Sequence, residues 1–131
     1  MTRNFLSTIA LLLGVSLLLC AADGIWLARV PDKDRQKQNP YHAQPDAIAA
    51  GRNLFLDHCA SCHGEKAEGR GKKPSLRTFT VQQGASEGEL HWLLVNGSLG
   101  RGMPSWSKLP DAQRWQLVAY LKSLGMKELP R

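Results

Sequence analysis

Apolar positions recur at helical spacing in three stretches of the chain, and the first of them covers residues 47–63. Its apolar and small positions fall on one side of a helix, with Asp46 before it as a good N-cap. Gly51 lowers helix stability, so it indicates a close approach by another helix. The positions that share this side are Ile48, Gly51, Leu54 or Phe55, and Cys59.

Two further helices follow. Ser86 and Glu89 form a capping box for the second, which ends at Gly97. The third runs from Pro110 or Asp111 to Leu124, with Gly125 as its stop. The second helix has its apolar face at Leu90, Leu93 and Leu94, and the third at Trp115, Leu117, Val118, Tyr120 and Leu121.

No strand pair and no internal repeat is visible, so the sequence predicts a small all-α domain with three or more short helices and long loops. Residues 97–109 are expected to form one of these loops. Three short helices enclose too little apolar area for a loop-rich domain of about 85 residues to be comfortably stable. A large, flat, apolar cofactor would fill such a centre.

The N-terminus predicts export. Arg3 precedes an uncharged apolar run from Phe5 to Ala22, which is typical of an export segment and just long enough to span a bilayer. We expect residues 1–22 to be a cleaved signal peptide or a retained membrane anchor, with lipidation at Cys20 a weaker third reading. The domain then lies in the periplasm or on the periplasmic face of the cytoplasmic membrane.

Residues 23–45 hold three prolines and a polar run, which predicts a mobile linker with little to bury. The domain proper is expected at 46–131. Its net charge is mildly basic, since the whole chain carries +6. No ladder of aromatic and basic residues appears, so nucleic acid is not an expected partner.

The chemistry is concentrated in residues 59–64, Cys-Ala-Ser-Cys-His-Gly. C-x-x-C-H is a haem c attachment signature, in which Cys59 and Cys62 bind the vinyl groups and His63 supplies an axial nitrogen. A thioredoxin-type disulfide would need a strand and a βαβ pattern. A structural zinc site would need a second ligand pair, which His42, His58 and His91 do not form. Haem c is therefore the favoured reading.

With this motif the sequence resembles a class I, monohaem c-type cytochrome from about Ala47 to Gly125. The similarity rests on three blocks: GRNLFLDHCASCHG, GRGKKPSL and GRGMPSWSKLPDAQRWQLVAYLKSLG. It implies a small cytochrome c fold wrapped around one covalent haem c. It also implies that the first and last helices cross, with Gly51 and Phe55 opposite Leu117 and Tyr120.

The resemblance extends to further site residues. Met103, between Gly102 and Pro104, matches the family's axial methionine, so the metal ligands are expected to be His63 and Met103. Pro74 matches the proline whose carbonyl accepts the histidine's other N–H. Trp106 either lines the haem or is a core residue. Arg77 and Arg101 are weaker candidates for pairing with the haem propionates.

The expected function is one-electron transfer between exported or membrane redox proteins, with no catalytic residues in this chain. A basic loop would suit partners with acidic docking surfaces. The alternatives are a haem c subunit of a larger dehydrogenase or terminal oxidase complex, and, if Met103 is not a ligand, a haem sensor or peroxidase. The basic loop comprises Lys66, Arg70, Lys72, Lys73 and Arg77.

Overall fold

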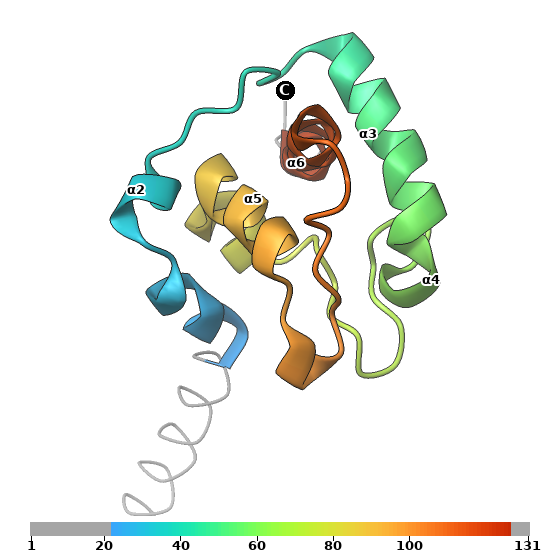
Figure 1. Ribbon diagram of the computed structural model, residues 1–131. Coiled ribbons are helices and arrows are strands. Elements are labelled where there is room, and N and C mark those ends of the chain that lie inside the picture. Colours follow the sequence, from blue (N-terminus) through green and yellow to red (C-terminus); the bar gives the residue numbers. More distant parts are fainter. Residues whose placement is uncertain (1–21, 127–131) are drawn as a thin grey trace, which may run out of the picture.

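The computed structural model describes residues 22–126, in which the regular elements are all helices, with isolated bridges but no strands (Figure 1). The all-α expectation is confirmed. The elements in chain order are η1 (Ala22–Arg29), α2 (Asp32–Arg35), α3 (Pro45–His58), α4 (Ala60–His63), η2 (Thr80–Gly84), α5 (Glu87–Asn96), η3 (Leu99–Arg101) and α6 (Asp111–Met126).

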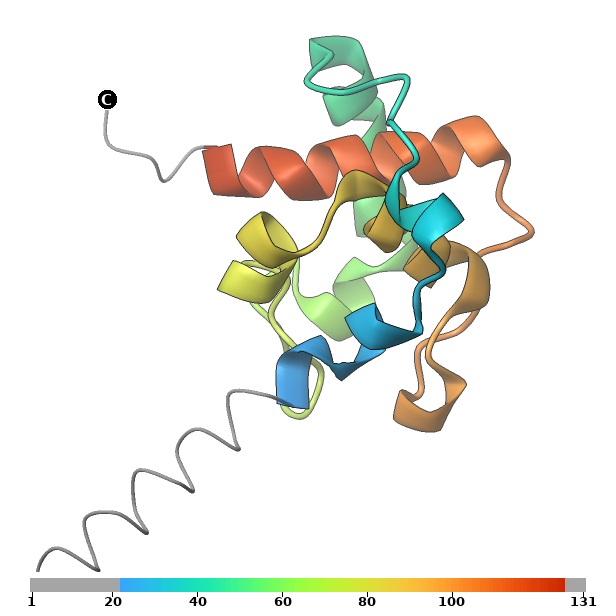
Figure 2. The ribbon, with the colours of Figure 1, turned by 90° about the vertical axis from the view of Figure 1, so that its left-hand side faces the viewer.

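The core centres on the crossing of α3 and α6, which Figure 2 shows with α6 lying across α3. Gly51 lies where the two backbones meet, because a Cβ there would come 2.9 Å from the Cβ of Tyr120. One turn later, the Phe55 and Tyr120 rings pack with their centroids 5.3 Å apart. Phe55 and Leu117 are almost fully buried. The expected crossing is confirmed, and it explains the glycine inside α3.

Two expected boundaries of the first helix are wrong. The helix begins at Pro45, with Gln44 rather than Asp46 as N-cap. Proline suits this position because its fixed φ is helical and its missing N–H needs no partner; Asp46 lies in the first turn instead. The helix also does not run unbroken through the motif, since Cys59 (φ −118°) separates α3 from α4.

Gly125 does not end the last helix, which continues to Met126. The glycine instead makes room for Gln82 of η2, because a Cβ at Gly125 would lie 2.5 Å from Gln82 Oε1. Gln82 Nε2 donates to the carbonyls of Leu121 at 3.1 Å and Leu76 at 2.7 Å. The small residue thus serves packing between α6 and η2.

The second helix agrees with its sequence pattern. Ser86 Oγ accepts from Glu89 N at 3.1 Å, while Glu89 Oε2 accepts from Ser86 N at 2.7 Å, so the capping box is confirmed. The helix ends before Gly97, as expected. The loop that follows holds one 3-10 turn, η3, which the sequence reading did not include.

The expected linker is a packed part of the domain. Residues 23–45 contain most of η1 and all of α2, and Figure 1 shows α2 beside α5. Val30 and Asn39 are buried, with 4% and 6% of their surface exposed. The Asn39 amide donates to the Trp115 carbonyl at 3.1 Å. The polar composition did not indicate this packing because long-range hydrogen bonds, together with a few scattered apolar contacts, hold the segment.

Residues 5–21 of the apolar run, Cys20 among them, lie outside the described residues. Within residues 22–126, none of the helices is both long and apolar enough to cross a bilayer.

Candidate functional site: the C-x-x-C-H turn and its two loops

The motif is held as a single helical turn at the end of α3. The Cys59 carbonyl accepts from the N–H groups of Cys62 at 3.1 Å and His63 at 2.9 Å. Cys59, Cys62 and His63 therefore all lie within one tight turn. Cys59 is half-buried and Cys62 is exposed.

The chain after the motif folds back onto it. His63 O accepts from Gly69 N at 2.6 Å, and Leu76 N donates to the carbonyl of buried Ala67 at 2.9 Å. Gly69 adopts φ +89°, a left-handed conformation that favours glycine. These contacts close the loop, so that Pro74 returns to the motif.

The His63 ring is oriented by this returning loop. Its Nδ1 lies 2.9 Å from the Pro74 carbonyl oxygen, so the contact expected from the sequence is present. A carbonyl oxygen only accepts hydrogen bonds, which places the proton on Nδ1. In the neutral ring with this tautomer, Nε2 carries the lone pair that an axial histidine uses to bind a metal. The donor set of the turn thus fits a covalently attached haem.

Met103 lies in a second closed loop. Ser98 and Met103 exchange two backbone hydrogen bonds, of 2.9 and 3.1 Å, across η3. Gly97 has φ +67°, and a Cβ there would lie 2.7 Å from the Pro104 carbonyl carbon. Met103 itself is half-buried and packs against the core cluster. The loop therefore fixes the position of the Met103 backbone, from which the side chain extends.

Trp106 ties this loop to the helices. Its backbone N–H donates to Leu94 O at 2.8 Å, and its ring lies 5.3 Å from that of His58, next to Cys59. The sequence reading named Trp106 but missed His58 as its neighbour, because no local spacing relates residues 48 positions apart. Lys73 provides a second link, since its Nζ lies beside Gly102. Trp106 thus joins the second loop to α5 and α3, and Lys73 brings the first loop beside the second.

The two other readings of the motif find no support in the geometry. Burial raises the pKa of the Cys59 thiol to about 11, with the neighbouring Cys62 contributing. A thioredoxin-type pair needs the opposite shift, a lowered thiol pKa. Within residues 22–126, no group of three or more His, Cys, Asp or Glu side chains gathers to hold a metal ion, as a structural zinc site would.

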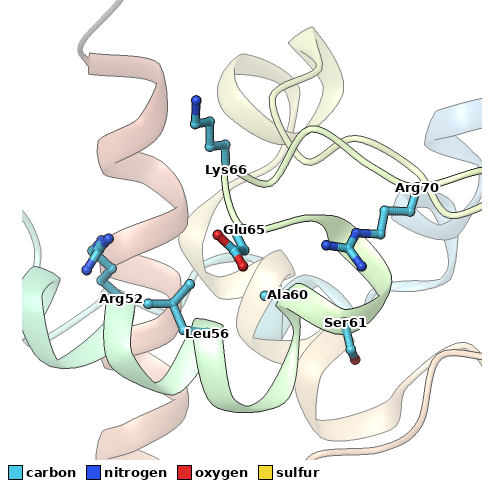
Figure 3. A pocket seen from close by; sticks show the side chains of 7 residues that line it. All are labelled: Arg52, Leu56, Ala60, Ser61, Glu65, Lys66 and Arg70. Carbon is cyan, nitrogen blue, oxygen red and sulfur yellow. The ribbon is translucent and has the colours of Figure 1, made fainter.

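An open hollow of about 570 Å³ lies on the outer side of α4, where the two residues between the cysteines line it. Figure 3 shows basic side chains from α3 and from the loop after the motif around it, together with one carboxylate. The hollow therefore carries an excess of positive charge beside the motif. Its lining residues are Arg52, Leu56, Ala60, Ser61, Glu65, Lys66 and Arg70.

Comparison with known proteins gives consistent matches. Subunit CcoP of the cbb3-type cytochrome c oxidase of Azospirillum brasilense is 38% identical over 89 residues, covering 61% of this chain and 30% of that protein. CcoP of Rhodobacter capsulatus is 36% identical over 88 residues, covering 58% of this chain and 29% of that one. The chain thus spans about 30% of the length of these relatives.

Among solved structures, cytochrome cL of Methylophaga aminisulfidivorans aligns with a TM-score of 0.56 and 28% identity, over 66% of this chain and 58% of that one. This match confirms the expected cytochrome c fold. Proteins of this class carry covalent haem c and transfer electrons through it, so the expected cofactor and the electron-transfer role of the domain are confirmed as well.

A protein-family model matches the chain as well. Residues 46–121, more than half of the chain, match the family model described as cytochrome c oxidase, cbb3-type, subunit III. That stretch contains the C-x-x-C-H turn, Pro74 and Met103. The chain belongs to the cytochrome c oxidase, cbb3-type, subunit III family and is a c-type cytochrome.

Proposed function

We propose that this chain is the haem c subunit of a membrane redox complex and passes single electrons to the catalytic partner. The observation that carries the proposal is the His63 Nδ1–Pro74 O hydrogen bond, which leaves Nε2 available on the same turn as the two cysteines. Cys59 and Cys62 would attach haem c, which when bound supplies a one-electron Fe(III)/Fe(II) couple.

Met103 is the proposed second axial ligand. A thioether is a soft ligand that favours ferrous iron and raises the reduction potential relative to a second histidine. Its closed loop and the Trp106–Leu94 hydrogen bond hold it near the core. Trp106 is proposed to line the haem beside His58. Two protein ligands, His63 and Met103, would leave the iron no position for a substrate, so catalysis would reside in the partner.

The partner is proposed to be a redox protein with an acidic docking surface. Arg52, Lys66 and Arg70 surround the hollow behind the motif, against the single carboxylate of Glu65. Positive charge beside the motif would steer an acidic surface toward it and make the association rate fall with ionic strength.

The location proposed is the periplasmic side of the cytoplasmic membrane. The uncharged run from Phe5 to Ala22 behind Arg3 supports export. The named relatives are subunits of a terminal oxidase, which favours a retained anchor over a cleaved signal. A free carrier is the second candidate, favoured by the fold match to cytochrome cL. Isolation from native membranes separates the two, because only a subunit co-purifies with a large partner.

The ligand assignment is tested by Met103→Ala. The expected result is loss of the Met–iron charge-transfer band of the oxidised protein and a lower reduction potential. Met126→Ala is the matched control and should change neither. An unchanged band and potential in Met103→Ala would show that Met103 is not a ligand and would favour the sensor or peroxidase alternative.

The attachment is tested by a pyridine haemochrome spectrum of the wild type, of each single cysteine variant and of the double variant. Each single variant should shift the band as one thioether is lost. Haem that stays covalently bound after replacement of both Cys59 and Cys62 would refute the central assignment.

A further inference from the structure

The segment before the family match is attached to the domain at several points. We call residues 22–45 the N-terminal strap. Arg35 of α2 places Nη1 2.9 Å from Glu89 Oε1, a carboxylate whose side chain is only 4% exposed. Its Nη2 donates to the carbonyls of Leu27 and Val30, each at 3.2 Å. One guanidinium therefore joins η1, the following turn and the start of α5.

The first turn of α5 is shaped to receive the strap. Ser86 Oγ donates to Arg35 O at 2.9 Å. Gly88 is buried against the strap backbone, and a Cβ there would overlap Asp34 O and lie 3.0 Å from the carbonyl oxygens of Arg35 and Lys37. A glycine inside a helix is costly, so its presence here fits a close backbone approach.

The far end of the strap is held as well. The Asn39 amide donates to Trp115 O and to Glu87 Oε1, each at 3.1 Å. Trp26 and Leu27, nearer its beginning, pack against the core cluster. Contacts at both ends exclude a description of residues 22–45 as a loose tether.

Two large apolar side chains stay exposed where the strap begins. Ile25 of η1 is 56% exposed, and Phe79, directly before η2, is 79% exposed. The two elements are in contact, since a Cβ at Gly24 would lie 3.8 Å from Thr80 Cγ2. Residues more than fifty positions apart thus present apolar groups from adjoining elements.

The chain itself indicates what covers these groups. The uncharged run from Phe5 to Ala22 ends where η1 begins, three residues before Ile25. If that run is held in a bilayer, Ile25 lies at the lipid surface because only two residues separate it from the end of the run. Exposed Arg29, in the last turn of η1, suits anionic headgroups.

We propose that the N-terminal strap is a rigid mount that seats the cytochrome domain on the lipid surface through Ile25 and Phe79. The proposal rests on the retained anchor of the proposed function. A flexible chain over residues 23–45 would let the domain range roughly 25 Å from its anchor. The docked strap removes this freedom, so the haem would serve neighbours fixed in the same complex rather than distant carriers.

The test uses the full-length holoprotein in vesicles of phosphatidylethanolamine and phosphatidylglycerol, with Cys20→Ser as background. A nitroxide is attached at Phe79→Cys or at Ala49→Cys, and its relative accessibility to oxygen and to a water-soluble nickel complex is measured by electron paramagnetic resonance. Ala49 is exposed on the N-terminal half of α3, which both Figure 1 and Figure 2 place at the other end of the domain from η1.

The expected result is an oxygen-to-nickel accessibility ratio severalfold higher at position 79 than at position 49. Adding Arg35→Ala should bring the ratio at position 79 down toward that at position 49, whereas Lys33→Ala, an exposed residue of the same helix, should leave it high.

Equal ratios at the two positions would overturn the proposal, as would a ratio at position 79 that survives Arg35→Ala. A mature native chain that starts after residue 22 would also overturn it. In each of these cases an intact haem c spectrum with the Met–iron band would leave the electron-transfer assignment standing, so the two failures are distinguishable.

Discussion

Gly51 of α3 lies so close to Gln116 of α6 that a Cβ on the glycine would overlap the Gln116 carbonyl oxygen. This contact sets the distance between the two helices at the crossing. Because Cys59 is the C-cap of α3, the same crossing fixes where the C-x-x-C-H turn stands relative to the core. The relationship has a direct consequence for stability.

Gly51→Ala should lower the free energy of unfolding by about 1–3 kcal/mol, since a backbone atom cannot move aside as a side chain would. The loss should appear despite the roughly 1 kcal/mol by which alanine favours a helix over glycine. Denaturant titration of the holoprotein measures it. Gly100→Ala is the control, because no atom lies within 4 Å of a Cβ there; equal stability of the two variants would contradict the packing argument.

Glu89→Ala should destabilise the protein by about 2–4 kcal/mol, because it removes the capping box and leaves Arg35 without its buried partner. Arg35 also contacts Asp32 at 3.7 Å, but that carboxylate is 89% exposed. Asp32→Ala should therefore cost less than about 0.5 kcal/mol. Thermal unfolding of both variants compares the buried and the exposed carboxylate that contact Arg35. Similar losses of stability in the two variants would refute the claim that the buried partner matters more.

His91 should make stability depend on pH. Its ring is buried, stacks on Trp115 at 4.0 Å, and donates from Nε2 to Asp111 at 2.9 Å. Burial lowers the His91 pKa below 6.5; the Asp111 carboxylate opposes this shift, while Arg114 and Lys37 add to it. The unfolded chain therefore takes up the proton first as pH falls below 6.5.

This His91 contribution is fully present above pH 6.5 and is lost as pH falls from there toward the lowered folded pKa. His91→Gln keeps an N–H for Asp111 but cannot titrate. Denaturant titrations at about pH 7 and about pH 5 should show a smaller loss on acidification in the variant than in the wild type. Parallel losses would mean that His91 does not contribute.

Lys122→Met should loosen η2 from α6. The Lys122 ammonium donates to three carbonyls, of Val81 at 3.1 Å, Gln82 at 2.9 Å and Ala85 at 2.6 Å. Methionine keeps most of the side-chain volume but offers no donor, so we expect a loss of about 1–2 kcal/mol. Hydrogen exchange should rise first in residues 80–85. Lys108→Met, at an exposed loop position, should leave both quantities unchanged.

Features set by neighbouring residues were predictable. The Ser86–Glu89 capping box and the stop at Gly97 each depend on a few consecutive positions. Gly51 was predictable as a site of close approach because a glycine inside a helix demands a reason. Asp46 and Gly125 misled for the opposite reason. Each is a typical helix-boundary residue. Pro45, however, begins the helix one residue before Asp46, and Gly125 lies inside α6, where its small size leaves room for Gln82.

The strap was not predictable from its composition. Its polar run forms contacts with residues about fifty or more positions away, such as Arg35 with Glu89 and Asn39 with Trp115. Several of these contacts end on backbone carbonyls, which every residue carries and which leave no pattern in the sequence.

The sequence by itself determined the chemistry of this protein, because the spacing of Cys59, Cys62 and His63 is a property of one helical turn. It also determined the presence of α3, α5 and α6, whose signals are local. Only the tertiary structure decided how the turn is oriented and mounted. It brings the Pro74 carbonyl to His63 Nδ1 and docks the strap on α5, because loop closure and long-range hydrogen bonds depend on the whole chain being folded at once.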